Sequence, residues 1–150
     1  MLPVTLIDPV DLVNLRALME RTGGSPEVRI GLIDGPILTQ HPDLAGQPLR
    51  VIRDHNSARC AQASSPACLH GTFVAGILSA RRSSPAPAMC PDCTVLIRPI
   101  YGGVAAERDG TPSAAAKELA AAIVECIDAG ARVINLSLAW RNLSRQGSSQ

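Results

Sequence analysis

The chain has 150 residues, of which 46% are hydrophobic and 18% are charged, and its formal net charge is +1. This composition is typical of a single globular domain and excludes an intrinsically disordered chain. The small net charge argues against nucleic-acid binding, and no apolar run approaches the roughly 20 residues that a membrane helix needs. We therefore expect a globular domain that binds neither nucleic acid nor a membrane.

The first elements along the chain are helical. Asp8-Pro9 combines a capping residue with a proline at the first helical position, and leucines then recur at helical spacing until Gly23-Gly24. This pattern predicts one continuous helix, so we expect residues 1–27 to form an N-terminal helical segment. No basic stretch followed by an apolar one precedes it, as a secretory signal would require, and we expect a cytoplasmic protein.

Four short apolar runs predict β-strands. Val28 to Ile33 is nearly unbroken and fits a strand that is buried on both faces of a parallel sheet. Residues 131–138 predict another buried strand, and residues 49–52 predict a weaker one. Residues 94–100 also have strand character, although Pro99 requires a sheet edge or a bulge at that point.

Helices alternate with these strands. Residues 72–80 predict a helix with His70 at its beginning, and a loop precedes it. A second helix has Thr111-Pro112 as its N-terminal signature and Gly130 just beyond its C-terminus. Alternation of strands and helices predicts an α/β fold of three layers, with a mostly parallel sheet flanked by helices.

Two polar motifs lie where the crevice of such a sheet is expected. Asp34-Gly35 ends the first strand, and His70 begins the run His-Gly-Thr-Phe-Val-Ala-Gly. A helix N-terminus disfavours imidazolium, so His70 should stay neutral and basic, and a nearby carboxylate would fix its tautomer. Alone, an Asp-Gly after a strand is usually a turn and a loop histidine is usually a surface residue. The joint pattern favours Asp34 and His70 as a catalytic or formerly catalytic pair.

These motifs resemble those of the subtilisin-like serine proteases (subtilases), whose triad occurs in the chain order Asp, His, Ser. His70 to Gly76 matches the histidine motif, with Phe73 replacing a second histidine. Asp34-Gly35 is similar to the aspartate motif, in which Ser or Thr normally follows the Asp. The resemblance extends from Val28 to Ala139. It implies a serine endopeptidase that acts on a peptide or protein substrate without a cofactor.

The resemblance also implies where the substrate binds. Ser137, Leu138 and Ala139 would line one side of the cleft, and Gly102 and Gly103 would face it from the other. The substrate would then be held as an added β-strand through main-chain hydrogen bonds. Taken by itself, the stretch that contains Ser137 is also typical of an ordinary core strand.

Three further segments resemble a subgroup, the subtilases that process ribosomal peptide precursors of the cyanobactin type. They are Asp34-Gly35-Pro36, Pro99-Ile100-Tyr101 and residues 129–135. Many subtilases bind calcium in a loop after the histidine helix, but residues 81–85 here contain two arginines and no carboxylate. Asp43 matches a single calcium-ligand position, and we expect no metal site.

Five cysteines leave at least one thiol unpaired, and without an export signal they favour a reducing compartment. Cys90 and Cys93 have C-x-x-C spacing, and Cys60 and Cys68 lie upstream. Four thiolates could hold a structural zinc ion, and a disulfide is a second possibility. Ordinary free thiols are the expectation that we favour.

The nucleophile of the subtilases lies in a Gly-Thr-Ser-x-Ala motif far downstream, beyond an oxyanion-hole Asn, and neither is recognisable here. Ser113 lies in a similar run, but helix capping explains that run fully. We therefore expect residues 28–150 to be a partial subtilisin-like peptidase domain, truncated before its serine. The missing C-terminal half would follow in the same gene or belong to a second chain, as in a split protease. The other alternative is a catalytically inactive module that binds a peptide or a protein.

Overall fold

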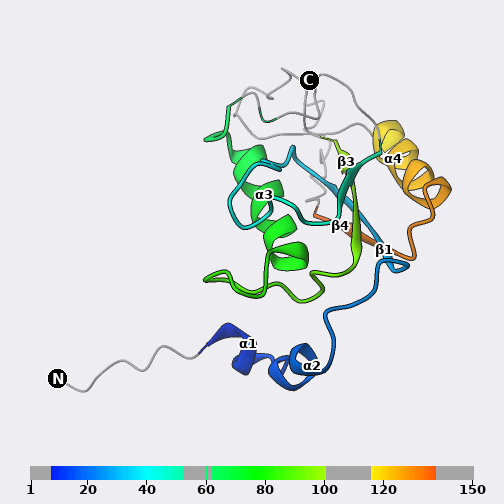
Figure 1. Cartoon of the computed structure of the whole chain (residues 1–150). Coiled ribbons are helices and arrows are strands. Elements are labelled where there is room, and N and C mark those ends of the chain that lie inside the picture. Colours follow the sequence, from blue (N-terminus) through cyan, green and yellow to red (C-terminus); the bar gives the residue numbers. More distant parts are fainter. Residues whose placement is uncertain (1–7, 53–59, 61, 101–115, 138–150) are drawn as a thin grey trace, which may run out of the picture.

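The computed structural model describes residues 8–52, 60, 62–100 and 116–137. A four-stranded sheet forms its centre, and all strand pairs are parallel (Figure 1). The strands, in spatial order, are β2 (Leu49–Val51), β3 (Thr94–Pro99), β1 (Arg29–Asp34) and β4 (Val133–Leu136). This arrangement confirms the predicted α/β fold with a parallel sheet.

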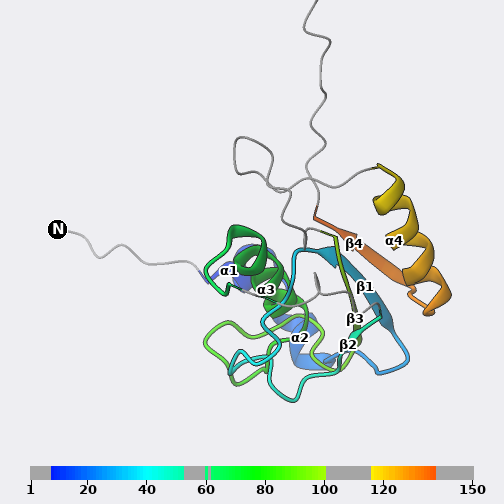
Figure 2. The same cartoon turned by 90° about the horizontal axis from the view of Figure 1, so that it is seen from above.

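One helix covers each face of the sheet, which gives three layers (Figure 2). Helix α3 (Pro66–Ser79) packs on one face, and α4 (Ala116–Asp128) packs on the other. Side chains alternate along β1, so Leu32 belongs to the core under α3 and Ile33 to the core under α4. Among the described residues, no helix is long and apolar enough to cross a membrane.

Strand β1 is buried, as predicted, but the expectation of a second buried strand at residues 131–138 is wrong. β4 lies at the edge of the described sheet, and its Val133 and Leu136 are about half exposed, at 54% and 47%. β3 lies between β2 and β1. The last hydrogen bond between this part of the chain and β3 runs from the Ile52 amide to the Ile97 carbonyl, and the nitrogen of Pro99 faces the same side because Ile100 donates to β1. Pro99 has no N–H with which to continue this ladder, so among the described residues the pairing of β3 with β2 ends there, which is the sheet edge that Pro99 was expected to require.

A buried ion cluster joins α4 to the sheet. The guanidinium of Arg98, which is only 2% exposed, contacts Glu118 and Glu125 of α4, each at 2.6 Å. Two carboxylates and the carbonyl oxygen of Pro99 give this buried cation the partners it needs. Gly130, with φ of +84°, follows the end of α4 as predicted. The expected start of that helix at Thr111-Pro112 lies outside the described residues.

The described part of the N-terminal segment, residues 8–27, contains two short helices instead of one. α1 (Pro9–Leu12) begins at Asp8, whose carboxylate accepts a hydrogen bond from the Val10 amide, as predicted. Asn14 then adopts a φ of +55°, which ends the helical path before α2 (Arg16–Arg21). Asparagine tolerates this left-handed conformation because its short polar side chain bonds locally. The single helix that the leucine spacing predicted is therefore wrong.

The cysteines differ from the expectation of free thiols throughout. Cys60 and Cys68 form a disulfide, whereas Cys90, Cys93 and Cys126 are free. The disulfide removes two ligands from a four-thiolate zinc site and weakens the argument for a reducing compartment. A cytoplasmic location stays a prediction. Burial raises the pKa of the Cys90 thiol to about 11, so this thiol is protonated and unreactive at neutral pH.

Reduction of the Cys60–Cys68 disulfide should destabilise the protein. The bridge closes a loop with a sequence separation of 8, and its loss should lower the free energy of unfolding by about 2.5 kcal/mol. Urea unfolding with and without reductant measures this, and the Cys60→Ser, Cys68→Ser double variant should not respond to reductant. Alkylation of the unfolded, unreduced chain should modify three cysteines, and modification of all five would contradict the pairing.

Candidate functional site

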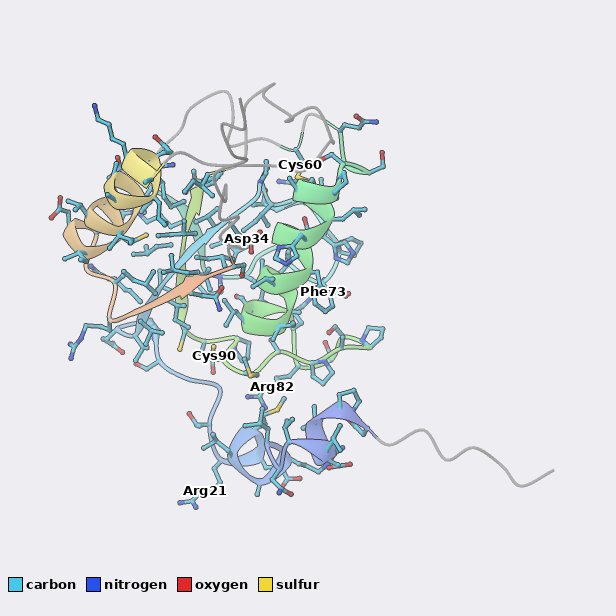
Figure 3. All side chains as sticks on the ribbon, turned by 180° about the vertical axis from the view of Figure 1, so that it is seen from behind. Arg21, Asp34, Cys60, Phe73, Arg82 and Cys90 are labelled. Carbon is cyan, nitrogen blue, oxygen red and sulfur yellow. A yellow bond between two sulfur atoms is a disulfide. The ribbon has the colours of Figure 1, made fainter. Side chains whose placement is uncertain are left out.

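Asp34 lies at the carboxyl end of β1, where it is 1% exposed. Its position follows from the alternation of β1: Ile30 and Leu32 face α3, and Asp34 shares their side. Its neighbour across the β1–β3 ladder is Pro99. Figure 3 shows Asp34 between the end of β4 and helix α3.

The His70 side chain of α3 meets this carboxylate. Its Nδ1 lies 2.8 Å from Asp34 Oδ1, which also accepts the Gly35 amide hydrogen at 2.6 Å. Since an ionised carboxylate can only accept, His70 Nδ1 carries a hydrogen and Nε2 of the neutral ring is an acceptor. The ring is 54% exposed, whereas the carboxylate is buried. The pair can therefore take up a proton from a group on the solvent side and hold the resulting imidazolium beside an anion.

The sequence pattern predicted that His70 begins its helix, and this prediction is wrong. Helix α3 starts at Pro66, and Ser65 is its N-cap, with its hydroxyl accepting the Cys68 amide hydrogen at 3.3 Å. His70 is thus in the second turn, where the helix dipole has little effect, and the Asp34 carboxylate determines its tautomer instead. The sequence signal for the true start of the helix is Ser65-Pro66, a capping residue followed by proline, as in Asp8-Pro9. The prediction that placed the helix start at His70 did not use this signal.

Two glycines allow α3 to approach the end of β1 so closely. A Cβ at Gly35 would lie 2.1 Å from the carbonyl oxygen of Ala67, and a Cβ at Gly71 would lie 2.6 Å from that of Gly35. Any side chain at either position would push the two backbones apart. Each glycine directly follows one member of the pair, so the two motifs contain both the polar groups and the space for their contact.

A hydroxyl ties the same helix to the loop after β1. Thr72 Oγ1 accepts the Leu38 amide hydrogen at 2.9 Å. Phe73, at the position of the second histidine of the subtilase motif, is 66% exposed and does not take part in this contact. Thr72 therefore has a structural function in the motif, which its spacing alone did not indicate.

Of the expected substrate-binding residues, the structure describes Ser137. Its amide donates to the Ile33 carbonyl at 3.4 Å, and its hydroxyl donates to Asn135 Oδ1 at 2.8 Å. Ser137 therefore continues the β1–β4 register and lies beside Asp34. The other expected members, Leu138, Ala139, Gly102 and Gly103, lie outside the described residues, as does Ser113.

No cluster of three or more potential metal-ligating side chains occurs within the described part of the chain. Near Asp43, the residue that matches a calcium-ligand position, the guanidinium of Arg81 donates to the carbonyl oxygen of Pro42. A cationic side chain thus already occupies this neighbourhood, which is unfavourable for a calcium ion.

A buried aspartate and an exposed histidine in this order on a parallel α/β sheet are typical of subtilisin-like proteases. The Subtilase family matches residues 25–150, and the chain belongs to this family. No curated protein matches the sequence.

Several solved structures are similar to the chain. The prenylagaramide maturation protease PagA has 26% sequence identity and a TM-score of 0.66 over 84% of this chain. A mutant of the protease domain of PatA has 30% identity and a TM-score of 0.67 over 77% of this chain. A lanthipeptide protease has 20% identity and a TM-score of 0.61 over 92% of this chain, which shows the fold alone. The chain spans 40%, 39% and 36% of the lengths of these three proteins, respectively.

The close backbone contact predicts opposite effects for two glycines of α3. Gly71→Ala should lower the free energy of unfolding by about 2 kcal/mol, because the new methyl group meets the carbonyl oxygens of Gly35 and Pro36. Gly76→Ala is the matched control: a Cβ there meets no atom within 4 Å, and better helix propensity should add up to about 1 kcal/mol. Chemical unfolding measures the free energy of unfolding of both variants. Equal changes in the two variants would contradict the importance of the backbone contact between Gly71 and the loop after β1.

Proposed function

We propose that this chain is the N-terminal part of a subtilisin-like serine endopeptidase domain, in which Asp34 orients His70 and His70 is the general base. The observation that supports this most directly is the 2.8 Å contact between His70 Nδ1 and the buried Asp34 Oδ1. The contact leaves Nε2 available on an exposed ring, as a general base requires.

In the proposed mechanism, the nucleophilic serine comes from the part of the peptidase that this chain does not contain. His70 Nε2 takes the proton of the serine hydroxyl as the oxygen attacks the peptide carbonyl, and later gives it to the leaving amine. Asp34 stays ionised throughout and stabilises the imidazolium. Burial of Asp34 strengthens this effect, because water does not screen the charge.

For the substrate, we propose a peptide that binds in extended form. Ser137, Leu138 and Ala139 would line one side of the cleft, and Gly102 and Gly103 the other, with main-chain hydrogen bonds holding the peptide as an added strand. The maturation proteases among the similar structures support peptides that are cleaved during maturation as a substrate class. In domain terms, residues 28–150 would belong to the peptidase, and residues 1–27 would form a helical segment before it.

The role of Asp34 can be tested in a polypeptide that continues through the serine motif. Asp34→Asn should lower kcat by roughly 10⁴-fold, because the amide favours the wrong imidazole tautomer. Asp43→Asn is the matched control, since this partly exposed carboxylate is outside the site, and peptide hydrolysis should be unchanged. Near-normal kcat in Asp34→Asn would overturn the proposed role.

The same experiment distinguishes the proposal from its alternatives. The 150-residue chain alone should neither hydrolyse peptides nor react with a fluorophosphonate probe, whereas the extended polypeptide should do both. A probe reaction only after mixing with a separate chain would indicate a split protease. Peptide binding without any probe reaction in the extended polypeptide would indicate an inactive binding module.

A further inference from the structure

One oxygen of the Asp34 carboxylate lacks a hydrogen-bond donor. Oδ1 accepts from the Gly35 amide and from His70, but Oδ2 is buried without a partner among the described residues. A buried carboxylate oxygen without a donor is costly, because it has lost its water and gained nothing in return. The position of Asp34 therefore demands a donor on the side of Oδ2.

The residue after Asp34 provides no such group from a side chain. Gly35 has none, and a Cβ there would collide with the carbonyl oxygen of Ala67. The backbone amide of Gly35 is already used by Oδ1. The donor must therefore come from a neighbouring element.

Strand β4 brings a hydroxyl to this place. Its register pairs Leu32 with Asn135 and Ile33 with Leu136, and the bond from the Ser137 amide to the Ile33 carbonyl extends the pairing by one residue. Ser137, the residue directly after β4, is thus beside Asp34 at about the usual strand spacing of roughly 4.8 Å. Paired residues of parallel strands point to the same face, so the hydroxyl and the carboxylate share the side that α3 covers.

We propose that Ser137 is a positioning residue whose hydroxyl donates to Asp34 Oδ2, with Asn135 as its own donor. A hydroxyl has one hydrogen, which in the structure is directed at Asn135 Oδ1 at 2.8 Å. A half-turn of the Asn135 amide places Nδ2–H toward Ser137 Oγ and frees the hydroxyl hydrogen for Asp34. The bonds then run in one direction, from Asn135 to Ser137 to Asp34.

This inference rests on the proposed function, because it matters for catalysis only if Asp34 orients His70. With Ser137 in place, three donors hold the carboxylate: the Gly35 amide, His70 Nδ1 and the Ser137 hydroxyl. These donors fix the plane of the carboxylate, and their hydrogen bonds stabilise its negative charge. Ser137 would therefore act on the reaction through Asp34, in addition to its expected place beside the substrate.

Proton NMR of the 150-residue chain with ¹⁵N-labelled histidine tests the proposal. The hydrogen on His70 Nδ1 should give a low-field signal. Ser137→Ala should move that signal further downfield, because a carboxylate with one donor fewer accepts more strongly from His70. Ser137→Thr keeps a hydroxyl and should restore the original position. Ser79→Ala is the matched control, since it removes a buried hydroxyl of α3 that has no partner among the described residues.

The outcomes separate this inference from the function on which it rests. If His70 carries its hydrogen on Nε2 in the unsubstituted chain, the proposed role of Asp34 fails. If the Nδ1–H tautomer is present but Ser137→Ala and Ser79→Ala leave the signal equally unmoved, the role of Ser137 is overturned and that of Asp34 stands. Ser137→Cys offers a weaker donor where the alanine variant does not fold, and its signal should move the same way by less.

Discussion

The contact between the backbone after β1 and the first turns of α3 is the constraint on which the site depends. Gly35 and Gly71 let carbonyl oxygens of each element approach the other to distances that a Cβ would forbid. This places His70 and Asp34 2.8 Å apart. The glycines beside Asp34 and His70 thus allow the two backbones to touch. The distance between the two polar side chains is therefore set by a backbone contact and not by flexible side chains.

The parallel sheet adds a second constraint, the alternation of side chains along strands in register. Alternation places Asp34 toward α3 and Arg98 toward α4, where Glu118 and Glu125 neutralise it. Each buried charge therefore has a partner on its own face, and the two ionic groups stay separate. Register between β1 and β4 in turn brings Ser137 to the side of Asp34. The site is assembled from the ends of neighbouring strands, as is general for parallel sheets.

Two features next to each other in the described part of the chain are exposed, namely the edge strand β4 and the ring of His70. The similar structures of PagA and of the PatA protease domain are more than twice as long as the matched region. An orienting carboxylate that is buried and a base that is open suit a peptidase in which the nucleophile approaches from the solvent side. The asymmetry of exposure within the pair is therefore consistent with the proposed division of roles.

The sequence by itself determined the features that depend on neighbouring residues: the buried strand at residues 28–33, the Asp8 cap, the glycine after α4, and the two motifs that contain Asp34 and His70. These follow from local periodicity, capping chemistry and the spacing of polar residues. Only the tertiary structure decided that β4 is an edge strand, that Cys60 pairs with Cys68, and that Ser137 lies beside Asp34. These features depend on which distant segments meet, and strand order and register arise from packing against the whole core, which no local pattern encodes.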